Sequence, residues 1–332
     1  MSRIKIMTWN VENLFKPDAA AELPEQQRFD QKCALLARVI NDNDPDIVAL
    51  QEIGGEEPLH SLQQSLAGNF AHAVISLFPD RRGIRVAFLT KQAITERSDM
   101  VDFPPGPALG IFDLNAAGEA IPVTRMSRGA LRICLTVDGL KLDVITTHLK
   151  SKLLTFPRSG GTSFSPRDET ERTQVAGIAL HKRTAEAVTL RQHANLLLES
   201  AERIPLILLG DMNDVPHAQT SLILCGPPGS EIGTRGFDMS DQGDATRLFN
   251  VAPLLPADRN YSRRYHGRNE LLDQIFASEE FFPVGSDNKR KTPNVDSLVD
   301  FQTQLASIGD DPTLRSGEIA PDHAPVVADF SL

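Results

Sequence analysis

The chain has 332 residues, of which 41% are hydrophobic and 23% charged, proportions typical of a globular protein with a sizeable core. Its net charge of −10 argues against a protein that coats nucleic acid through bulk electrostatics, but leaves room for an enzyme with a local basic cleft. The three cysteines (Cys33, Cys134 and Cys225) are scattered, which argues against a disulfide framework and a zinc site.

No segment has the features of a membrane or export signal. Residues 1–10 include no apolar signal-peptide stretch. No apolar run approaches the ~20 residues that span a bilayer. We therefore expect a reduced, cytoplasmic protein with no membrane association and no obligate protein partner.

The first third of the chain alternates predicted strands and helices. Apolar and polar residues alternate in a strand that ends near Asn10, and a buried strand runs directly into Gln51-Glu52. Residues 102–122 are rich in Pro, Gly and Ala and predict an irregular loop. The strands are expected over residues 4–11, 46–50, 71–78 and 84–91, and the helices over residues 24–40 and 57–68.

The middle of the chain contains a hairpin, a long loop and a long helix. Asp138-Gly139 joins the strands 130–137 and 141–147, and the second strand leads to His148. Residues 151–167 predict a loop, and the periodic, charged segment 167–200 predicts one helix of roughly 50 Å or two helices with a break near Gly177. A buried apolar strand over residues 204–209 then ends abruptly at a polar segment.

The last third of the chain is expected to be mostly loop, over residues 226–270 and 283–320. Between these loops lies a strand over residues 271–278, and a turn into a final strand closes the chain at residues 322–330. Helices interleaved with tight hairpins predict an α/β fold with a pair of mixed sheets covered by helices, rather than a purely parallel sheet. No repeat or linker divides residues 1–332, so we expect a single domain.

Polar residues stand at the ends of six predicted strands. Asp211 and Asn213 are two positions apart, so an extended backbone directs both side chains to one face. Each of these residues alone has an adequate structural explanation, such as a turn, a helix cap or a buried histidine. Coincidence does not readily explain six strand ends that supply only carboxylates, amides and imidazoles. The others are Asn10, Glu52, His148, Asp273, Asp322 and His323.

This set of side chains suits the hydrolysis of a phosphoester. Mg²⁺ is held in proteins by one or two carboxylates and by water, which leaves positions for phosphate oxygens, and Glu52 with Asn10 fits that role. Asp211 can orient and deprotonate a water molecule. Hydrogen-bond donors for the phosphoryl oxygens are expected on Asn213, His148 and His323. A buried carboxylate behind His323 favours its charged form, and Asp273 can supply it.

The pattern resembles the endonuclease/exonuclease/phosphatase superfamily of metal-dependent phosphoesterases, which includes DNase I and exonuclease III. Seven matching pieces occur in the order of that family and span nearly the whole chain. They are Thr8-Trp9-Asn10, Gln51-Glu52-Ile53, Ser127-Arg128-Gly129, Thr147-His148-Leu149-Lys150, Gly210-Asp211-Met212-Asn213-Asp214, Leu272-Asp273-Gln274-Ile275 and Asp322-His323-Ala324-Pro325-Val326.

The resemblance implies a four-layer αββα sandwich, with two packed mixed sheets and outer helices, and it implies a role for each matching residue. Glu52 matches the metal-binding glutamate, while Asn10 and Asp322 match residues that assist at the metal. Asp211 and Asn213 match the water-orienting and phosphate-binding residues.

The remaining matches are residues that the resemblance places near the phosphate or the leaving group. Asp273 and His323 match the Asp–His pair, and His148 the histidine near the leaving group. Arg128 is a candidate phosphate contact. Gln274 stands where relatives often have His or Tyr, a difference expected to affect substrate contacts more than the chemistry. The implied cofactor is Mg²⁺, with Mn²⁺ as a substitute.

Two stretches beside the catalytic pieces bear on the substrate. One is a loop-helix insert at about 151–190, which is rich in Lys and Arg and follows Lys150. The other, residues 259–268, includes Tyr265 and Arg268. Basic residues and Tyr can hold a nucleic-acid backbone and stack on its bases, so Lys150, Tyr265 and Arg268 join Arg128 as candidate substrate-binding residues.

Acidic residues also alternate with the basic ones in the insert, which suits internal ion pairs on a solvated helix instead. We favour a Mg²⁺-dependent nuclease, most simply an endonuclease acting on DNA or another nucleic acid. The alternatives are a phosphatase or phosphodiesterase of a small or lipid-derived phosphoester (an inositol phosphate or a sphingomyelin-like lipid) and a catalytically inactive binding module of the same fold.

Overall fold

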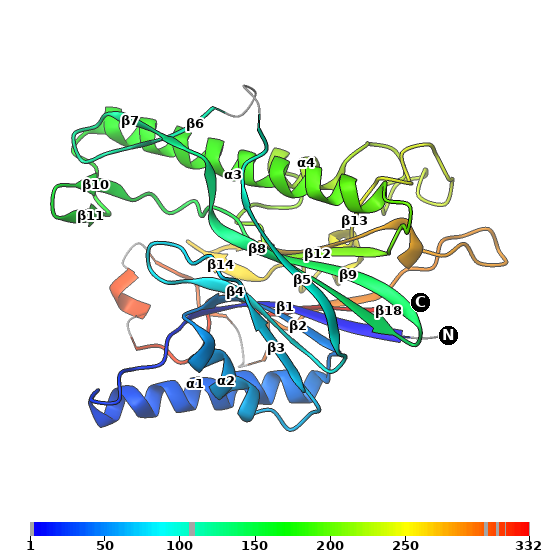
Figure 1. Ribbon diagram of the computed structural model, residues 1–332, viewed down its shortest axis with the longest axis horizontal. Coiled ribbons are helices and arrows are strands. Elements are labelled where there is room, and N and C mark those ends of the chain that lie inside the picture. The colour runs from blue at the N-terminus through cyan, green and yellow to red at the C-terminus, as the bar shows by residue number, and fades with distance from the viewer. Residues whose placement is uncertain (1–2, 106–109, 302–304, 310–311, 316, 332) are drawn as a thin grey trace.

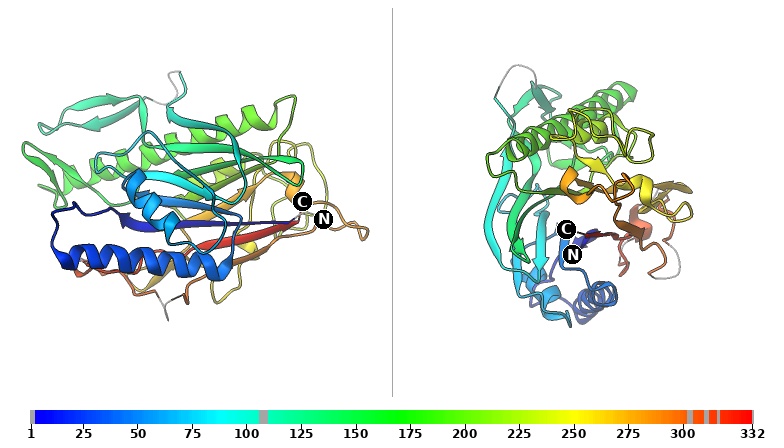
Figure 2. Two further views of the ribbon diagram at one scale, coloured as in Figure 1. Left: turned by 60° about the horizontal axis from the view of Figure 1, so that its bottom comes forward. Right: turned by 90° about the vertical axis from the view of Figure 1, so that its right-hand side faces the viewer.

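The computed structural model describes residues 3–105, 110–301, 305–309, 312–315 and 317–331. Two six-stranded mixed sheets pack face to face, and helices cover their outer faces (Figure 1). Two further views show the same layers, with α1 outside one sheet and α3 outside the other (Figure 2). The α/β sandwich expected from the sequence is therefore confirmed.

The first sheet contains the amino-terminal and carboxy-terminal strands in the order β17-β18-β1-β2-β4-β3. β1 and β2 are parallel and the other neighbours are antiparallel. The strands are β1 (Arg3–Leu14), β2 (Ile47–Ile53), β3 (His72–Ile75), β4 (Arg85–Thr90), β17 (Asn294–Ser297) and β18 (Val326–Ser331), and the covering helices are α1 (Leu23–Asn43) and α2 (Glu56–Gln64).

The second sheet has the order β13-β16-β12-β9-β8-β5. β9 and β12 are parallel, and the expected hairpin at Asp138-Gly139 joins β8 to β9. The strands are β5 (Ile94–Asp102), β8 (Arg125–Val137), β9 (Leu140–His148), β12 (Leu206–Asp211), β13 (Phe249–Asn250) and β16 (Asp273–Ala277), and the helices on this side are α3 (Glu169–Leu198) and α4 (Gln219–Cys225).

The main hydrophobic core lies between the two sheets, where residues from both inner faces form one cluster. Ile6, Phe88 and Phe330 of the first sheet join Leu131 and Ile207 of the second in this cluster. A second cluster lies under α1 and a third under α3, each between the helix and its sheet. Burial of this apolar surface on both faces of each sheet explains the nearly continuous apolar runs in the central strands.

Three short hairpins and the short strands β13 and β17 occur where the sequence predicts loops. β5 is a largely exposed edge strand whose polar residues give no apolar alternation, and β17 lies inside the loop predicted at 283–320. The irregular loop predicted at 102–122 is wrong where β6 and β7 pair. The hairpins are β6 (Ile111–Leu114) with β7 (Ala120–Val123), β10 (Phe156–Arg158) with β11 (Gly161–Ser163), and β14 (Arg263–Tyr265) with β15 (Arg268–Glu270).

Helix α3 runs without interruption through Gly177, so the single-helix alternative is correct. Its carboxyl half packs on the second sheet through residues that include Ala187, Leu190 and Ala194. In the described part of the chain, 3₁₀ turns lie at Ala252–Leu254, Glu279–Phe281 and Pro312–Arg315. Across the described ranges, no helix combines the length and apolarity needed to cross a bilayer.

Candidate active site

The predicted site residues meet where the central strands of both sheets end. Within the second sheet, the last residue of β12, Asp211, pairs in the ladder with His148 on one side and with Asp273 on the other. The Asn10 amide of the first sheet reaches across and donates to Asp211 Oδ2 at 3.0 Å. Strands far apart in the sequence therefore place three of the predicted side chains around the Asp211 carboxylate.

The Asp211 carboxylate is held by several donors. In addition to Asn10, the backbone N–H of Asn213 donates to Oδ1 at 2.8 Å, and His148 Nε2 lies 3.3 Å from Oδ2. Burial raises the pKa of Asp211 to about 6, while the charge of His323 opposes this rise. A carboxylate has about four lone-pair positions, so Asp211 retains capacity to accept a proton from water.

Glu52 and Asn10 form the candidate metal site. Asn10 Nδ2 lies 3.5 Å from Glu52 Oε1, and the N–H of Asn13 donates to Glu52 Oε2 at 3.0 Å. Glu52 has a left-handed φ of 67°, a strained conformation that redirects the chain as it leaves β2. Within the described residues, no three His, Cys, Asp or Glu side chains group as metal ligands. One carboxylate and one amide suit Mg²⁺, which keeps several waters and takes phosphate oxygens.

His323 and Asp273 form a buried pair. Asp273 Oδ2 lies 2.6 Å from His323 Nδ1, and both side chains are almost fully buried. The indole N–H of Trp9 donates to the backbone carbonyl of His323 at 2.8 Å and fixes this segment against β1. Burial alone would lower the pKa of His323, but the carboxylates of Asp273, Asp322 and Asp211 outweigh it and raise the pKa to about 10. His323 is therefore a charged donor at neutral pH.

His148 differs from His323 in its charge. Burial lowers the pKa of His148 well below its ordinary value, and the neighbouring Arg128 lowers it further, so His148 is neutral at pH 7. Its Nε2 faces Asp211 and lies 4.0 Å from Glu52 Oε1. Among the described residues, its buried Nδ1 has no hydrogen-bond partner. The two histidines of this site therefore differ in charge, since His148 is neutral and His323 is positively charged.

Asn213 and Arg128 both hold the backbone that follows His148. Asn213 has a left-handed φ of 50° and donates from Nδ2 to the Leu149 carbonyl at 3.0 Å. Arg128 is buried, lies 3.1 Å from Asp80 and donates to the carbonyls of His148 and Leu149. These bonds occupy some of the N–H groups with which both residues are predicted to bind phosphate. Contact of Asn213 or Arg128 with substrate remains a prediction.

Of the other predicted residues, Lys150 and Asp322 lie close enough to His148 and His323, respectively, to shift the pKa values of these histidines. Burial and the charge of Arg128 lower the pKa of Lys150 to about 8, and its ammonium donates to the Ser151 carbonyl at 3.0 Å. Arg263 lies 3.4 Å from Asp322, and its guanidinium stacks 5.3 Å from the ring centre of Tyr265. Tyr265 is 40% exposed. Arg268 is exposed and stands at the start of β15.

Gln274 lies on the other side of the sheet from the site. Adjacent strand residues face opposite sides of a sheet, so Gln274 faces away from the Asp273 side. It is buried and bonds to Asn250, to Ser221 and to the backbone carbonyl of Asp214. Its amide is therefore a structural contact beneath the site, and an effect of this position on substrate contacts remains a prediction.

Several residues around the site were missed by the sequence analysis. Glu186 and Arg183 of α3 are buried and hydrogen-bond to segments next to His148 and Asn213. Glu12, two positions after Asn10, pairs with Arg315 and accepts from the Asp322 N–H. The only sequence signal for the helical pair was a three-residue spacing of opposite charges, which also describes a solvated helix face.

The model of the Endonuclease/Exonuclease/phosphatase family matches residues 7–293 of the chain. No curated protein matches the sequence significantly. Among solved structures, the human Nocturnin catalytic domain shares 18% identity, with 99% of this chain and 94% of that chain covered and a TM-score of 0.52.

Two further structures are similar over their full length. A humanized D. rerio TDP2 carrying 14 mutations shares 16% identity, with 100% of each chain covered and a TM-score of 0.54. A mannosyl-6-phosphatase of Bacteroides thetaiotaomicron shares 15% identity, covering 99% of this chain and 100% of that chain, with a TM-score of 0.54. At these identities the structures share a fold with this chain.

Proposed function

The chain belongs to the Endonuclease/Exonuclease/phosphatase family of hydrolytic phosphoesterases, and we propose that it is a Mg²⁺-dependent phosphodiester hydrolase that acts on nucleic acid. One observation carries the proposal. A buried carboxylate, Asp211, lies between a metal-type pair, Glu52 and Asn10, and a charged His–Asp pair, His323 and Asp273. Binding alone requires no such base.

Asp211 is the proposed base for the attacking water. The amide of Asn10 and the backbone N–H of Asn213 fix the two oxygens of its carboxylate, so the orientation of the remaining lone pair is set before substrate arrives. Preorganisation of this kind removes the entropic cost of aligning the water with phosphorus. A pKa of about 6 leaves Asp211 ionised at neutral pH and basic enough to accept a proton.

His323 is the proposed stabiliser of the charge that develops on the phosphoryl oxygens. Asp273 accepts from Nδ1 of His323, which leaves its Nε2–H free to donate to an anion. Asn213 keeps a second N–H and adds an uncharged donor beside it, whereas the single N–H of neutral His148 faces Asp211. Mg²⁺ bound by Glu52 and Asn10 would supply the Lewis acidity that polarises the phosphoryl group.

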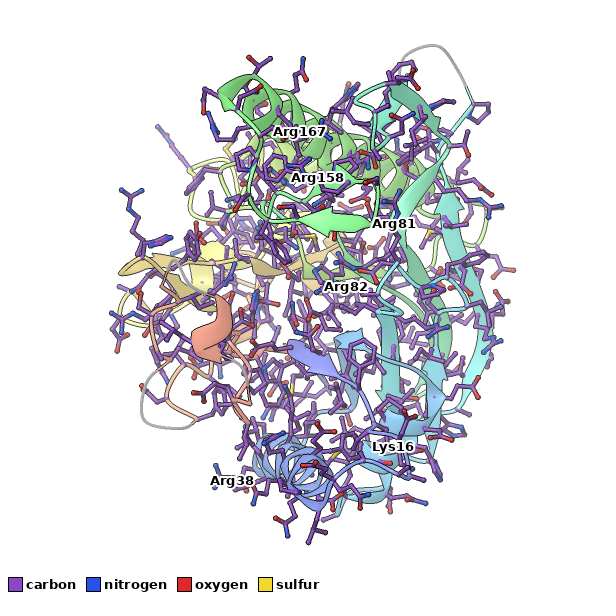
Figure 3. All side chains as sticks on the ribbon, turned by 90° about the vertical axis from the view of Figure 1, so that its left-hand side faces the viewer. Lys16, Arg38, Arg81, Arg82, Arg158 and Arg167 are labelled. Atoms are coloured by element: carbon purple, nitrogen blue, oxygen red, sulfur yellow. The ribbon has the colours of Figure 1, made fainter. Side chains whose placement is uncertain are left out.

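The basic residues around the strand ends support a polynucleotide substrate. Figure 3 faces the end of the molecule where the central strands finish, and on this side Arg81, Arg82, Arg158 and Arg167 lie above Lys16. The side chain of Arg81 is 81% exposed, and its contact with Asp113 is long at 3.9 Å. Arg81, Arg82 and Arg167 are exposed, and exposed cations on one side of the molecule suit the phosphates of a backbone.

A second candidate is a small phosphoester. Most basic residues of the stretch 151–190 form ion pairs with acids of this chain. The pairs are Arg158–Glu171, Arg167–Glu171, Arg172–Glu169, Lys182–Asp113, Arg183–Asp214 and Lys152–Asp214. This pairing reduces the charge available to a polyanion, and one structural neighbour is named as a mannosyl-6-phosphatase.

A substrate panel distinguishes the two candidates. Duplex DNA, single-stranded DNA, RNA, an abasic duplex, bis-p-nitrophenyl phosphate and inositol phosphates would each be incubated with Mg²⁺ and with EDTA. We expect EDTA-sensitive cleavage of at least one nucleic acid and weaker turnover of the small diester. Turnover restricted to inositol phosphates or other small esters would replace the nuclease proposal by the second candidate.

A further inference from the structure

Glu186 on α3 makes an unusual pair of hydrogen bonds. Its side chain is 1% exposed, although it extends from a helix outside the sheet. Its Oε1 accepts from the backbone N–H of Ser127 at 2.8 Å, and its Oε2 accepts from the N–H of Lys150 at 2.6 Å. One carboxylate thus binds two backbone segments, one ahead of Arg128 and the other just after His148.

The register of β8 and β9 explains why a carboxylate is needed there. The two strands pair from Val137↔Leu140 to Leu131↔Thr146. Ser127 and Lys150 each lie four residues beyond that last pair, so they would be opposite each other if the ladder continued. The strands separate instead, and Glu186 satisfies amide groups that would otherwise be buried without acceptors.

Arg183 lies three residues before Glu186 and completes the contact. Its guanidinium donates to the Lys150 carbonyl at 3.1 Å and to Asp214 Oδ2 at 3.2 Å. Lys150 is therefore held by α3 at both its N–H and its carbonyl. Asp214 directly follows Asn213, so the same side chain links the segment after His148 to the segment after Asp211.

We propose that Arg183 and Glu186 are positioning residues that align His148 with Asp211 and Asn213. This inference rests on the proposed function, because those three residues are its catalytic groups. Burial of two charges is costly in free energy unless each is fully hydrogen-bonded, and here the bonds go to the two catalytic segments. Helix α3 thus fixes the relative positions of the catalytic segments in addition to covering the sheet.

Arg191 on the same helix provides a matched control. It is buried like Arg183, but its guanidinium bonds to Asn195 and to the carbonyls of Leu224 and Thr246. None of these groups adjoins a proposed catalytic residue. Loss of Arg191 therefore tests the effect of removing a buried arginine from α3 without disturbing the alignment of the site.

The experiment measures kcat and KM for bis-p-nitrophenyl phosphate with Mg²⁺ in Arg183→Gln, Glu186→Gln and Arg191→Gln. A misplacement of about 1 Å at a reacting group costs on the order of 100-fold in rate. We expect kcat to fall roughly 10- to 100-fold in the first two variants, with KM within about 3-fold, and kcat to stay within about 2-fold in Arg191→Gln. If Arg183→Gln does not fold, Arg183→Lys, which keeps the positive charge, replaces it in the experiment.

The ring nitrogen resonances of His148, recorded by NMR in each folded variant, give a second readout that needs no turnover. We expect them to shift when Arg183 or Glu186 is replaced and to stay in place in Arg191→Gln. Unchanged kcat together with unchanged His148 resonances in folded Arg183 and Glu186 variants overturns the inference. An inactive wild type whose His148 resonances still shift contradicts the proposed function alone.

Discussion

Asp211 and His323 both have raised pKa values, but the physical causes differ. Burial disfavours the Asp211 anion and raises its pKa, whereas three carboxylates favour the His323 cation. His148, in the same cluster, is kept neutral by burial and by Arg128. Neighbouring groups thus divide into a base, a charged donor and a neutral imidazole, the separation expected of a hydrolytic site.

The His323–Asp273 pair predicts a pH-dependent stability. The folded pKa of His323 is raised from 6.5 to about 10, so its contribution to the free energy of unfolding is complete below pH 6.5 and lost as the pH rises towards 10. Urea unfolding of the metal-free protein between pH 6 and 10 measures this loss. We expect the difference in unfolding free energy between wild type and His323→Gln to shrink with rising pH. A constant difference would contradict the charged pair.

The metal site makes a second prediction at this scale. Glu52 is the carboxylate of the proposed Glu52–Asn10 metal pair, so Glu52→Gln removes the negative charge of that pair. We expect Mn²⁺ affinity, measured by EPR titration, to fall at least about 10-fold while the thermal unfolding midpoint of the apo protein changes little. A Mn²⁺ affinity equal to that of the wild type would show that the ion binds at another site.

Among the elements, β12 has the strictest backbone requirement. Gly210 has a φ of 145°, and a Cβ added there would lie 2.0 Å from the Thr147 carbonyl oxygen. The strands β9 and β12 therefore approach closely beside Asp211, and only glycine permits that contact.

Gly210→Ala should destabilise the fold by at least about 2 kcal/mol through overpacking and backbone strain. Gly177 in α3 is the matched control, since an added Cβ there meets nothing within 4 Å. Gly177→Ala should stabilise the protein by about 0.5–1 kcal/mol. Guanidinium unfolding measures both changes, and equal effects of the two substitutions would refute the argument.

Central strands could be predicted from the sequence, while edge elements could not. Apolar runs in β2 and β12 result from burial on both faces, so they are readable without a structure. β5 is mostly exposed, and its residues carry no comparable pattern. Arg183 and Glu186 resembled a solvated helix face because burial of charge depends on partners that are distant in the sequence.

For the whole molecule, the two-sheet architecture explains why seven separate motifs form one site. Two parallel strand pairs, β1 with β2 and β9 with β12, each end at the same side, so their terminal residues face one another across the interface between the sheets. The positions of Asn10, His148, Asp211 and Asp273 were predictable from this logic. The ion pairs of Arg128, Arg158 and Arg183 with acids of distant segments were not, and these pairs decide how much charge remains for substrate.

The central claim is Mg²⁺-dependent phosphodiester hydrolysis with Asp211 as the base. The most direct test is the rate of bis-p-nitrophenyl phosphate hydrolysis by wild type, Asp211→Asn and Asp143→Asn, each with Mg²⁺ and with EDTA. Asp143 is a buried carboxylate of the same sheet that pairs with Arg132, outside the site. We predict that Asp211→Asn lowers the Mg²⁺-dependent rate by about 100- to 10,000-fold, that EDTA abolishes it, and that folded Asp143→Asn retains it. Wild-type activity in folded Asp211→Asn, or activity that survives EDTA, would contradict the account.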